Sequence, residues 1–136
     1  MPGTLPSMMG TLSCVVLDCP DPVTLAEFYQ RILGGELDAG DPEFPMLTPP
    51  DGTRLAFQLV AVHNPPKWPD PARPQQFHLD FDAGTLADVE AKHGQVVTWG
   101  ATFVHDSGGK EKGFRVFTDP AGHPFCLCWE AGAATG

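Results

Sequence analysis

The sequence has few basic residues and no long hydrophobic run. Lys and Arg total 8 against 17 Asp and Glu, which gives a formal net charge of −9, and no basic cluster occurs along the 136 residues. Nucleic-acid surfaces and polybasic membrane patches depend on such clusters, so the composition argues against both. A membrane span needs roughly 18 or more consecutive apolar residues, and no run approaches this length. We therefore expect no nucleic-acid partner and no membrane partner.

The N-terminal stretch MPGTLPSMMGTLS also lacks the basic and apolar regions of a secretory signal peptide. This predicts a cytoplasmic protein whose four cysteines stay reduced. Cys126 and Cys128 lie two residues apart in a predicted strand, so their side chains point the same way, which is poor disulfide geometry. Their spacing is also not the CxxC of thioredoxin-like proteins. The two thiols are therefore either metal ligands or small hydrophobic residues in a core.

The length and the 42% apolar composition predict one domain with a single core, covering residues 1–136. In its first part, the β-branched run LSCVVLD predicts a strand. Asp21 as an N-cap and Pro22 at the first helical position predict a helix that ends at Gly34 and Gly35. Three short strands are expected to follow, around residues 36–39, 44–48 and 55–62. This first module covers residues 12–63.

Residues 64–76, NPPKWPDPARPQQ, contain five prolines and predict an extended, semi-rigid connector. A second module follows over residues 77–130. QFHLDFD predicts its first strand, and Thr85 with Asp88 predicts a capped helix start. The apolar face expected for this helix consists of Leu86, Val89, His93, Val96 and Val97. Strands from GATFVHD, GFRVFTD and FCLCWE complete the module, so the second half repeats the order of the first and indicates a duplicated unit.

Three motifs resemble the glyoxalase, bleomycin-resistance and extradiol-dioxygenase superfamily, also called vicinal oxygen chelate. They are LDCPDPVTLAEFYQRILGG after the first strand, HLDF at the start of the second module, and FTDPAGHPFCL near the end. Within the superfamily, the chain is most similar to small bacterial glyoxalase-like proteins. The resemblance implies an α+β fold with two tandem βαβββ modules, whose curved sheets face each other to form a cup. It is specific for the fold and not for the reaction.

The resemblance also implies positions for a metal site, because ligands in metal-dependent members come from the first and last strands of each module. The matching residues are Cys14, Gln58, His78 and Cys126. This set differs from the carboxylate-containing sets that a glyoxalase-type lyase or an extradiol dioxygenase uses. Two thiolates and an imidazole instead suit Zn(II). The favoured alternative is that Cys126 packs as a small hydrophobic residue or lines an apolar pocket.

Nine side chains are candidates for the ligand-binding lining of the cup. They are Phe57, Gln58, Trp68, His78, Trp99, Phe103, Arg115, Phe117 and Cys126. The aromatic rings offer stacking surfaces, and Arg115 can hold a ligand carboxylate or phosphate. Trp68 is a large apolar group in the connector, so we expect it to be buried against the cup mouth or a partner chain. An ordinary surface role is expected for His63, His93, His105 and His123.

The favoured function is that of a glyoxalase-like protein of unassigned reaction, which binds a small molecule in the cup between its modules. Two alternatives stay open. One is a metal-dependent lyase, isomerase or dioxygenase with the Cys/Gln/His/Cys site, and the other is a drug-sequestering protein of the bleomycin-resistance type, whose acidic, aromatic groove binds a cationic ligand. We also expect a homodimer, because the resemblance implies pairing of modules within or between chains and Trp68 offers an apolar anchor.

Overall fold

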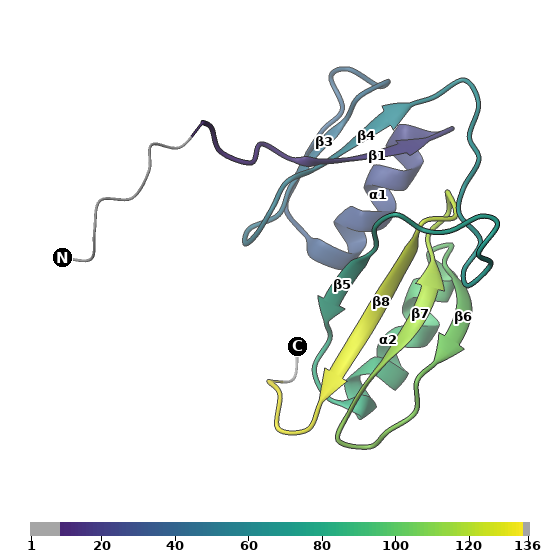
Figure 1. Cartoon of the computed structure of the whole chain (residues 1–136). Coiled ribbons are helices and arrows are strands. Elements are labelled where there is room, and N and C mark those ends of the chain that lie inside the picture. The colour runs from purple at the N-terminus through teal and green to yellow at the C-terminus, as the bar shows by residue number, and fades with distance from the viewer. Residues whose placement is uncertain (1–8, 135–136) are drawn as a thin grey trace.

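Two modules with the same order of elements follow one another in the computed structural model, which describes residues 9–134 (Figure 1). Module one consists of β1 (Val15–Cys19), α1 (Pro22–Leu33), β2 (Glu36–Asp38), β3 (Met46–Thr48) and β4 (Leu55–Leu59). Module two consists of β5 (Leu79–Asp82), α2 (Leu86–Thr98), β6 (Thr102–Asp106), β7 (Lys112–Thr118) and β8 (Pro124–Glu130). The fold is α+β with two βαβββ modules, as the sequence predicts. Residues 1–8 and 135–136 of the expected domain lie outside the described residues.

Both helices begin at the caps that the sequence indicates. The Asp21 side chain accepts a hydrogen bond from the Thr24 N–H, with Pro22 in the first turn of α1. Thr85 and Asp88 form the reciprocal capping box of α2. These caps satisfy N–H groups that have no partner inside a helix, so they fix where each helix starts. Neither of these helices combines the length and apolar character that crossing a membrane requires.

The apolar face of α2 is narrower than the sequence predicts. Val89 and Val96 are buried, as expected, whereas Val97 is 43% exposed. Adjacent helical residues point about 100° apart, so Val96 and Val97 cannot both face the sheet. Because Val96 faces the core, Val97 lies at the edge of the helix toward solvent.

Each module contributes a four-stranded sheet, in the orders β1-β4-β3-β2 and β5-β8-β7-β6. The first and last strands of each module pair in parallel, and the other pairs are antiparallel. In module two, Asp80 lies opposite Cys126 and Asp82 lies opposite Cys128. Strand alternation turns Phe125 and Leu127 to the helix-covered core and Cys126 to the other face, as predicted. The face of this sheet that α2 does not cover therefore carries Asp80 and Cys126, which line a cavity described below.

Helix α1 packs against module two as well as against its own sheet. The Tyr29 hydroxyl donates a 2.6 Å hydrogen bond to Asp119 Oδ2, and its ring contacts those of Phe81 and Phe125. On the other side of the contact, His123 Nε2 donates to the carbonyl of Asp18 at 2.6 Å. One buried cluster therefore contains residues of both modules. This packing fixes how the two sheets sit relative to one another.

Candidate functional site

The proline-rich connector runs from the end of β4 along the junction of the two modules to β5 (Figure 1). Within it, the Lys67 N–H donates to the Arg73 carbonyl at 2.8 Å, and the Arg73 N–H donates to the Asp70 carbonyl at 3.1 Å. Gly122 lies so close to Pro65 that an added Cβ would stand 2.8 Å from the proline Cβ, and its φ of +91° favours glycine. The connector is thus an ordered segment. Hydrogen bonds within it fix its turn, and Pro65 packs against the turn before β8.

A cavity with a volume of about 520 Å³ lies between the modules, beneath the connector, and is larger than the second cavity described below. Its walls come from β1, from the connector, from the start of β5 and from the turn before β8. The lining residues are Val15, Val16, Leu17, Asp18, Tyr29, Asn64, Pro65, Pro66, Arg73, Pro74, Gln76, Phe77, His78, Leu79, His123 and Pro124. This space fits the cup that the resemblance implies, because both modules contribute to it.

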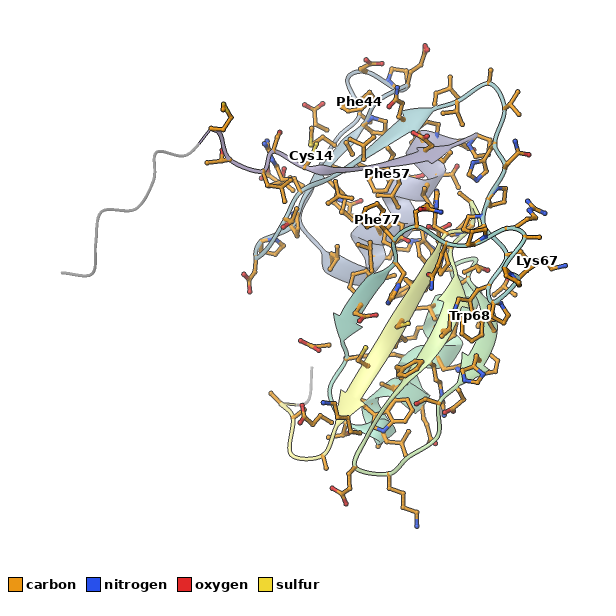
Figure 2. The ribbon with its side chains drawn as sticks, in the orientation of Figure 1. Cys14, Phe44, Phe57, Lys67, Trp68 and Phe77 are labelled. Carbon is orange, nitrogen blue, oxygen red and sulfur yellow. The ribbon has the colours of Figure 1, made fainter. Side chains whose placement is uncertain are left out.

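A smaller cavity of about 230 Å³ lies over the open face of the sheet of module two. Its lining consists of Trp68, Gln75, His78, Asp80, Phe114, Val116, Pro124, Cys126 and Cys128. His78 and Pro124 line both cavities, so the two spaces are neighbours. Figure 2 shows Trp68 beside this sheet and Phe77 at the junction of the modules.

Three potential metal ligands meet in the smaller cavity: His78, Asp80 and Cys126. One ligand atom from each lies within 4.8 Å of the others, and His78 Nε2 is 3.1 Å from Asp80 Oδ1. The arrangement follows from strand geometry, because residues two apart share a face and Asp80 is paired with Cys126 across β5 and β8. Within residues 9–134, this is the group of His, Cys, Asp and Glu side chains that meets this distance criterion.

Both thiols in this cavity are held in the protonated form. Burial, the charge of Asp80 and a hydrogen bond to Asp80 raise the pKa of Cys126 to about 12. Burial, followed by the charges of Asp80 and Asp82, also raises the pKa of Cys128. A free thiolate nucleophile is therefore disfavoured, since the thiolate is the reactive form. A metal ion bound by Cys126 would have to displace its proton.

Gln75 adds an unpaired polar atom to the same cavity. Its Oε1 is buried and has no hydrogen-bond partner among the described residues. A buried acceptor without a partner costs about 1–3 kcal/mol relative to a paired one. A ligand with an N–H or O–H group directed into this cavity would satisfy it.

Three of the predicted ligand-binding residues come together in the smaller cavity, namely Trp68, His78 and Cys126. The Trp68 ring also contacts the His105 ring of β6, with centroids 5.1 Å apart. Trp68 is half-buried within its own chain, over the smaller cavity and not at the larger one. His105 supports that ring instead of having only a surface role.

Cys14 and Gln58 do not join the cluster that His78 and Cys126 form. Gln58 is paired with Asp18 in the sheet of module one, and Cys14 precedes Asp18 by four residues, or about 13 Å along an extended strand. Figure 2 shows Cys14 in module one, away from the sheet of module two. Within residues 9–134, neither side chain lines the larger or the smaller cavity. The four-residue metal set transferred from the resemblance is therefore not assembled.

The remaining predicted lining residues lie on the helix-covered side of the sheets. Phe57 and Phe117 are fully buried, where Phe57 stacks on Tyr29 and Phe117 on Phe125. Arg115 is paired with Asp106 at 2.9 Å and Glu90 at 3.6 Å. Phe103 packs on the ring of His93 from α2, and Trp99 packs against the core at the end of that helix. Among the described residues, none of these side chains lines either of the two cavities.

The prediction that Arg115 and Phe117 line the cup is wrong by one position along β7. Phe114 and Val116 are the β7 residues that line the smaller cavity, opposite Cys128 and Cys126. Because successive strand residues point to opposite faces, a shift of one position exchanges the core for the cup. Asp80 was also missed, although its position two residues after His78 in HLDFD was a sufficient signal.

A family model described as a glyoxalase-like domain matches residues 14–128, nearly the whole of both modules. The chain belongs to the glyoxalase-like family. This confirms the resemblance drawn from the sequence motifs. Among curated proteins, none matches the chain significantly.

Several solved structures share the glyoxalase-like fold with this chain. A glyoxalase/bleomycin resistance protein/dioxygenase family enzyme from Burkholderia phytofirmans PsJN is 20% identical, with a TM-score of 0.68 over 88% of this chain and 98% of that one. A glyoxylase/bleomycin resistance protein/dioxygenase domain from Frankia sp. EAN1pec is 17% identical, with a TM-score of 0.66 over 93% and 96%. A glyoxalase-related enzyme from Fulvimarina pelagi is 17% identical, with a TM-score of 0.66 over 95% and 98%. Identities this low establish the fold and leave the reaction open.

Proposed function

We propose that this glyoxalase-like protein binds a small organic molecule in the larger cavity between its modules. The observation that supports the proposal is the cavity itself, whose volume of about 520 Å³ lies in the range of about 300–1,000 Å³ that ligand sites occupy. Its lining combines apolar side chains such as Val16 and Phe77 with a few polar ones such as Asn64 and His78. Such a lining binds an apolar body and orients it through a small number of hydrogen bonds.

The neighbouring smaller cavity supplies the polar end of the proposed site. His78 lies where the two cavities meet, so a ligand in the larger cavity reaches the imidazole before it reaches the buried thiol of Cys126. Beyond it, Asp80 accepts hydrogen bonds and Gln75 Oε1 has no partner. A ligand that extends past His78 with a donor group would be held at both ends.

Screening a fragment library by ligand-observed NMR tests this proposal. Val16→Trp fills the larger cavity from β1 and should abolish binding of the fragments that the wild-type protein binds. Val97→Trp is the matched control, because both valines are 43% exposed and Val97 lies on α2, away from both cavities. Fragments that bind the Val16→Trp protein as well as the wild type would contradict the proposal.

A second function, zinc-dependent chemistry, is favoured by the meeting of His78, Asp80 and Cys126. Imidazole nitrogen, carboxylate oxygen and thiolate sulfur are zinc ligands at about 2.0–2.3 Å, and three protein ligands with an open position are typical of catalytic sites. A bound zinc ion supplies Lewis-acid activation of a ligand carbonyl. Asp80 would provide the carboxylate that the transferred set lacked, so a zinc-dependent lyase or isomerase stays a candidate. A dioxygenase would instead need a redox-active metal such as Fe(II), because zinc does not change its oxidation state.

A further inference from the structure

We infer that the ligand of the larger cavity carries a carboxylate or phosphate group on its apolar body, and that Arg73 holds this anionic group. The inference rests on the proposed function, since it names the class of molecule that the cavity takes. It differs from the alternative of a drug-sequestering protein of the bleomycin-resistance type, which would bind a cationic ligand and which the net charge of −9 permits. The argument depends on where Arg73 lies, on what its guanidinium contacts, and on the rest of the lining.

Arg73 is positioned from both sides by the connector. Its backbone N–H donates to Asp70 and its carbonyl accepts from Lys67, so the turn of residues 67–73 is closed by hydrogen bonds. Its side chain lines the larger cavity, where Nη2 donates to the carbonyl of Pro65 at 2.8 Å. Arg73 is exposed, and this bond favours one orientation of its guanidinium before a ligand binds, which reduces the entropy lost on binding.

Most of the hydrogen-bonding capacity of Arg73 is free. A guanidinium carries five N–H donors, and the bond to Pro65 uses one of them. Within residues 9–134, the ion pairs involve His78 and Arg115, and no carboxylate lies within 4.0 Å of Arg73. Since none of the described carboxylates neutralises it, the positive charge of Arg73 is available to a ligand in the cavity that it lines. Its planar donors match a carboxylate or phosphate.

The other lining residues agree with an anion attached to an apolar body. Val15, Val16, Phe77 and Leu79 give apolar walls, and proline rings cover the connector side. Asp18 is the one carboxylate among the described residues that line the space. It repels an anion, so the anionic group is expected to lie toward Arg73 and away from β1.

The sequence predicts that Arg115 holds the carboxylate or phosphate of the ligand. The structure places Arg115 outside the larger cavity. Its guanidinium is already paired with Asp106 and Glu90 on the helix side of module two. Arg73 has the same chemistry without those partners and lies in the cavity. The charge that recognises the ligand thus comes from the connector.

Isothermal titration with 2-naphthoate and its neutral isostere 2-naphthamide tests the inference. Wild-type protein should bind naphthoate about tenfold or more tightly than naphthamide, as expected for hydrogen bonds to a charged group. Arg73→Gln should remove this preference, with naphthamide affinity unchanged, and Arg73→Lys should keep part of it. Arg54→Gln is the control of equal charge change, because Arg54 bonds to Ser13 away from the cavity. Asp18→Asn should strengthen naphthoate binding by a few fold.

Titration with 2-naphthyl phosphate identifies which anion is preferred, since tighter binding than naphthoate that depends on Arg73 would assign a phosphate. Equal affinities of naphthoate and naphthamide, or a preference that survives in folded Arg73→Gln protein, would overturn the inference and leave the proposed function standing. Failure of all three naphthalenes to bind would overturn both. Circular dichroism of each variant shows whether it is folded, and Arg73→Lys carries the test if Arg73→Gln is not.

Discussion

Asp80 connects His78 and Cys126, so that the three side chains form one cluster in module two. Its carboxylate lies 3.1 Å from His78 Nε2 and accepts a hydrogen bond from the Cys126 thiol. On the zinc proposal the same carboxylate becomes a ligand. Because it is one of the three ligands, removing its charge should weaken zinc binding more than removing the charge of Asp82, which lies outside the cluster.

We expect tag-free wild-type protein to bind one equivalent of zinc, and Asp80→Asn to bind it at least about tenfold more weakly, since removing even a hydrogen-bond partner of a zinc ligand has an effect of this size. Competition with a chromophoric chelator measures both affinities. Asp82→Asn is the control, because Asp82 lies further along β5, opposite Cys128 and outside the cluster. If Cys126 only packs, Cys126→Ala should lower stability by about 1 kcal/mol and leave metal content unchanged.

The high pKa of Cys126 predicts how zinc affinity depends on pH. The thiol pKa is about 12, so zinc must displace a proton from it at any pH near neutrality. Apparent zinc affinity should therefore rise with pH more steeply in the wild type than in Cys126→Ser, by up to about tenfold per pH unit. Chelator competition at a series of pH values gives the two slopes. Equal slopes would show that the thiol does not ligate the ion.

At the scale of elements, the contact of α1 with the turn between β7 and β8 connects the modules through a buried carboxyl. Asp119 accepts hydrogen bonds from the Tyr29 hydroxyl and from the N–H groups of Ala121 and His123. Burial raises the pKa of Asp119 despite these bonds, which act in the opposite direction. Burial also raises the pKa of Tyr29, so this hydroxyl remains the donor.

This shift predicts that stability falls as the pH rises. The folded Asp119 holds its proton more strongly than the unfolded chain does, so its contribution to stability is present below the ordinary carboxyl pKa and is lost as the pH rises through the folded pKa. Urea unfolding at increasing pH should show this decrease in the wild type. Asp119→Asn, which cannot ionise, should show a flatter profile. A wild-type profile no steeper than that of the variant would refute this reading.

Residues close in the sequence were sufficient to predict where the helices start. They were not sufficient to predict which face of a strand is buried. The caps at Asp21 and Thr85 depend on residues within three positions, so the sequence alone predicted both helix starts. The β7 strand has aromatic residues on both faces, Phe114 toward the cavity and Phe117 toward the core. Hydrophobicity therefore did not reveal which face was buried, and the packing of α2 decides it.

For the whole molecule, the site depends on how two sequentially distant units pack. The motifs predicted two βαβββ modules and the connector between them, because each of these is local in the sequence. The position of Arg73 over the cavity depends on the hydrogen-bonded turn of the connector and on the contact between α1 and module two. No spacing in the sequence encodes that position. This is why the predicted site lacked Arg73, whereas Asp80 follows from strand alternation in HLDFD and could have been found from the sequence.

The homodimer stays a prediction at this scale, although its anchor changes. Trp68, the expected apolar anchor, contacts His105 of its own chain and is half-buried, so it offers part of its ring to a second copy. Other apolar side chains are more exposed, among them Leu12, Val62 and Phe77, with exposed fractions of 73%, 75% and 89%. Covering them in a second copy would bury apolar surface. Sedimentation at micromolar concentration should show a dimer, and a monomer throughout the range would contradict the prediction.

The central claim is that a small molecule binds between the modules, beneath the connector. The most direct measurement is a set of ¹H–¹⁵N correlation spectra of the wild-type protein during titration with the tightest-binding fragment. The account predicts that the largest amide shifts come from Asp18, Arg73, Gln76, His78 and His123, which line the larger cavity. Largest shifts in α2 and β6, or no shifts on binding in the residues around the cavity, would contradict it.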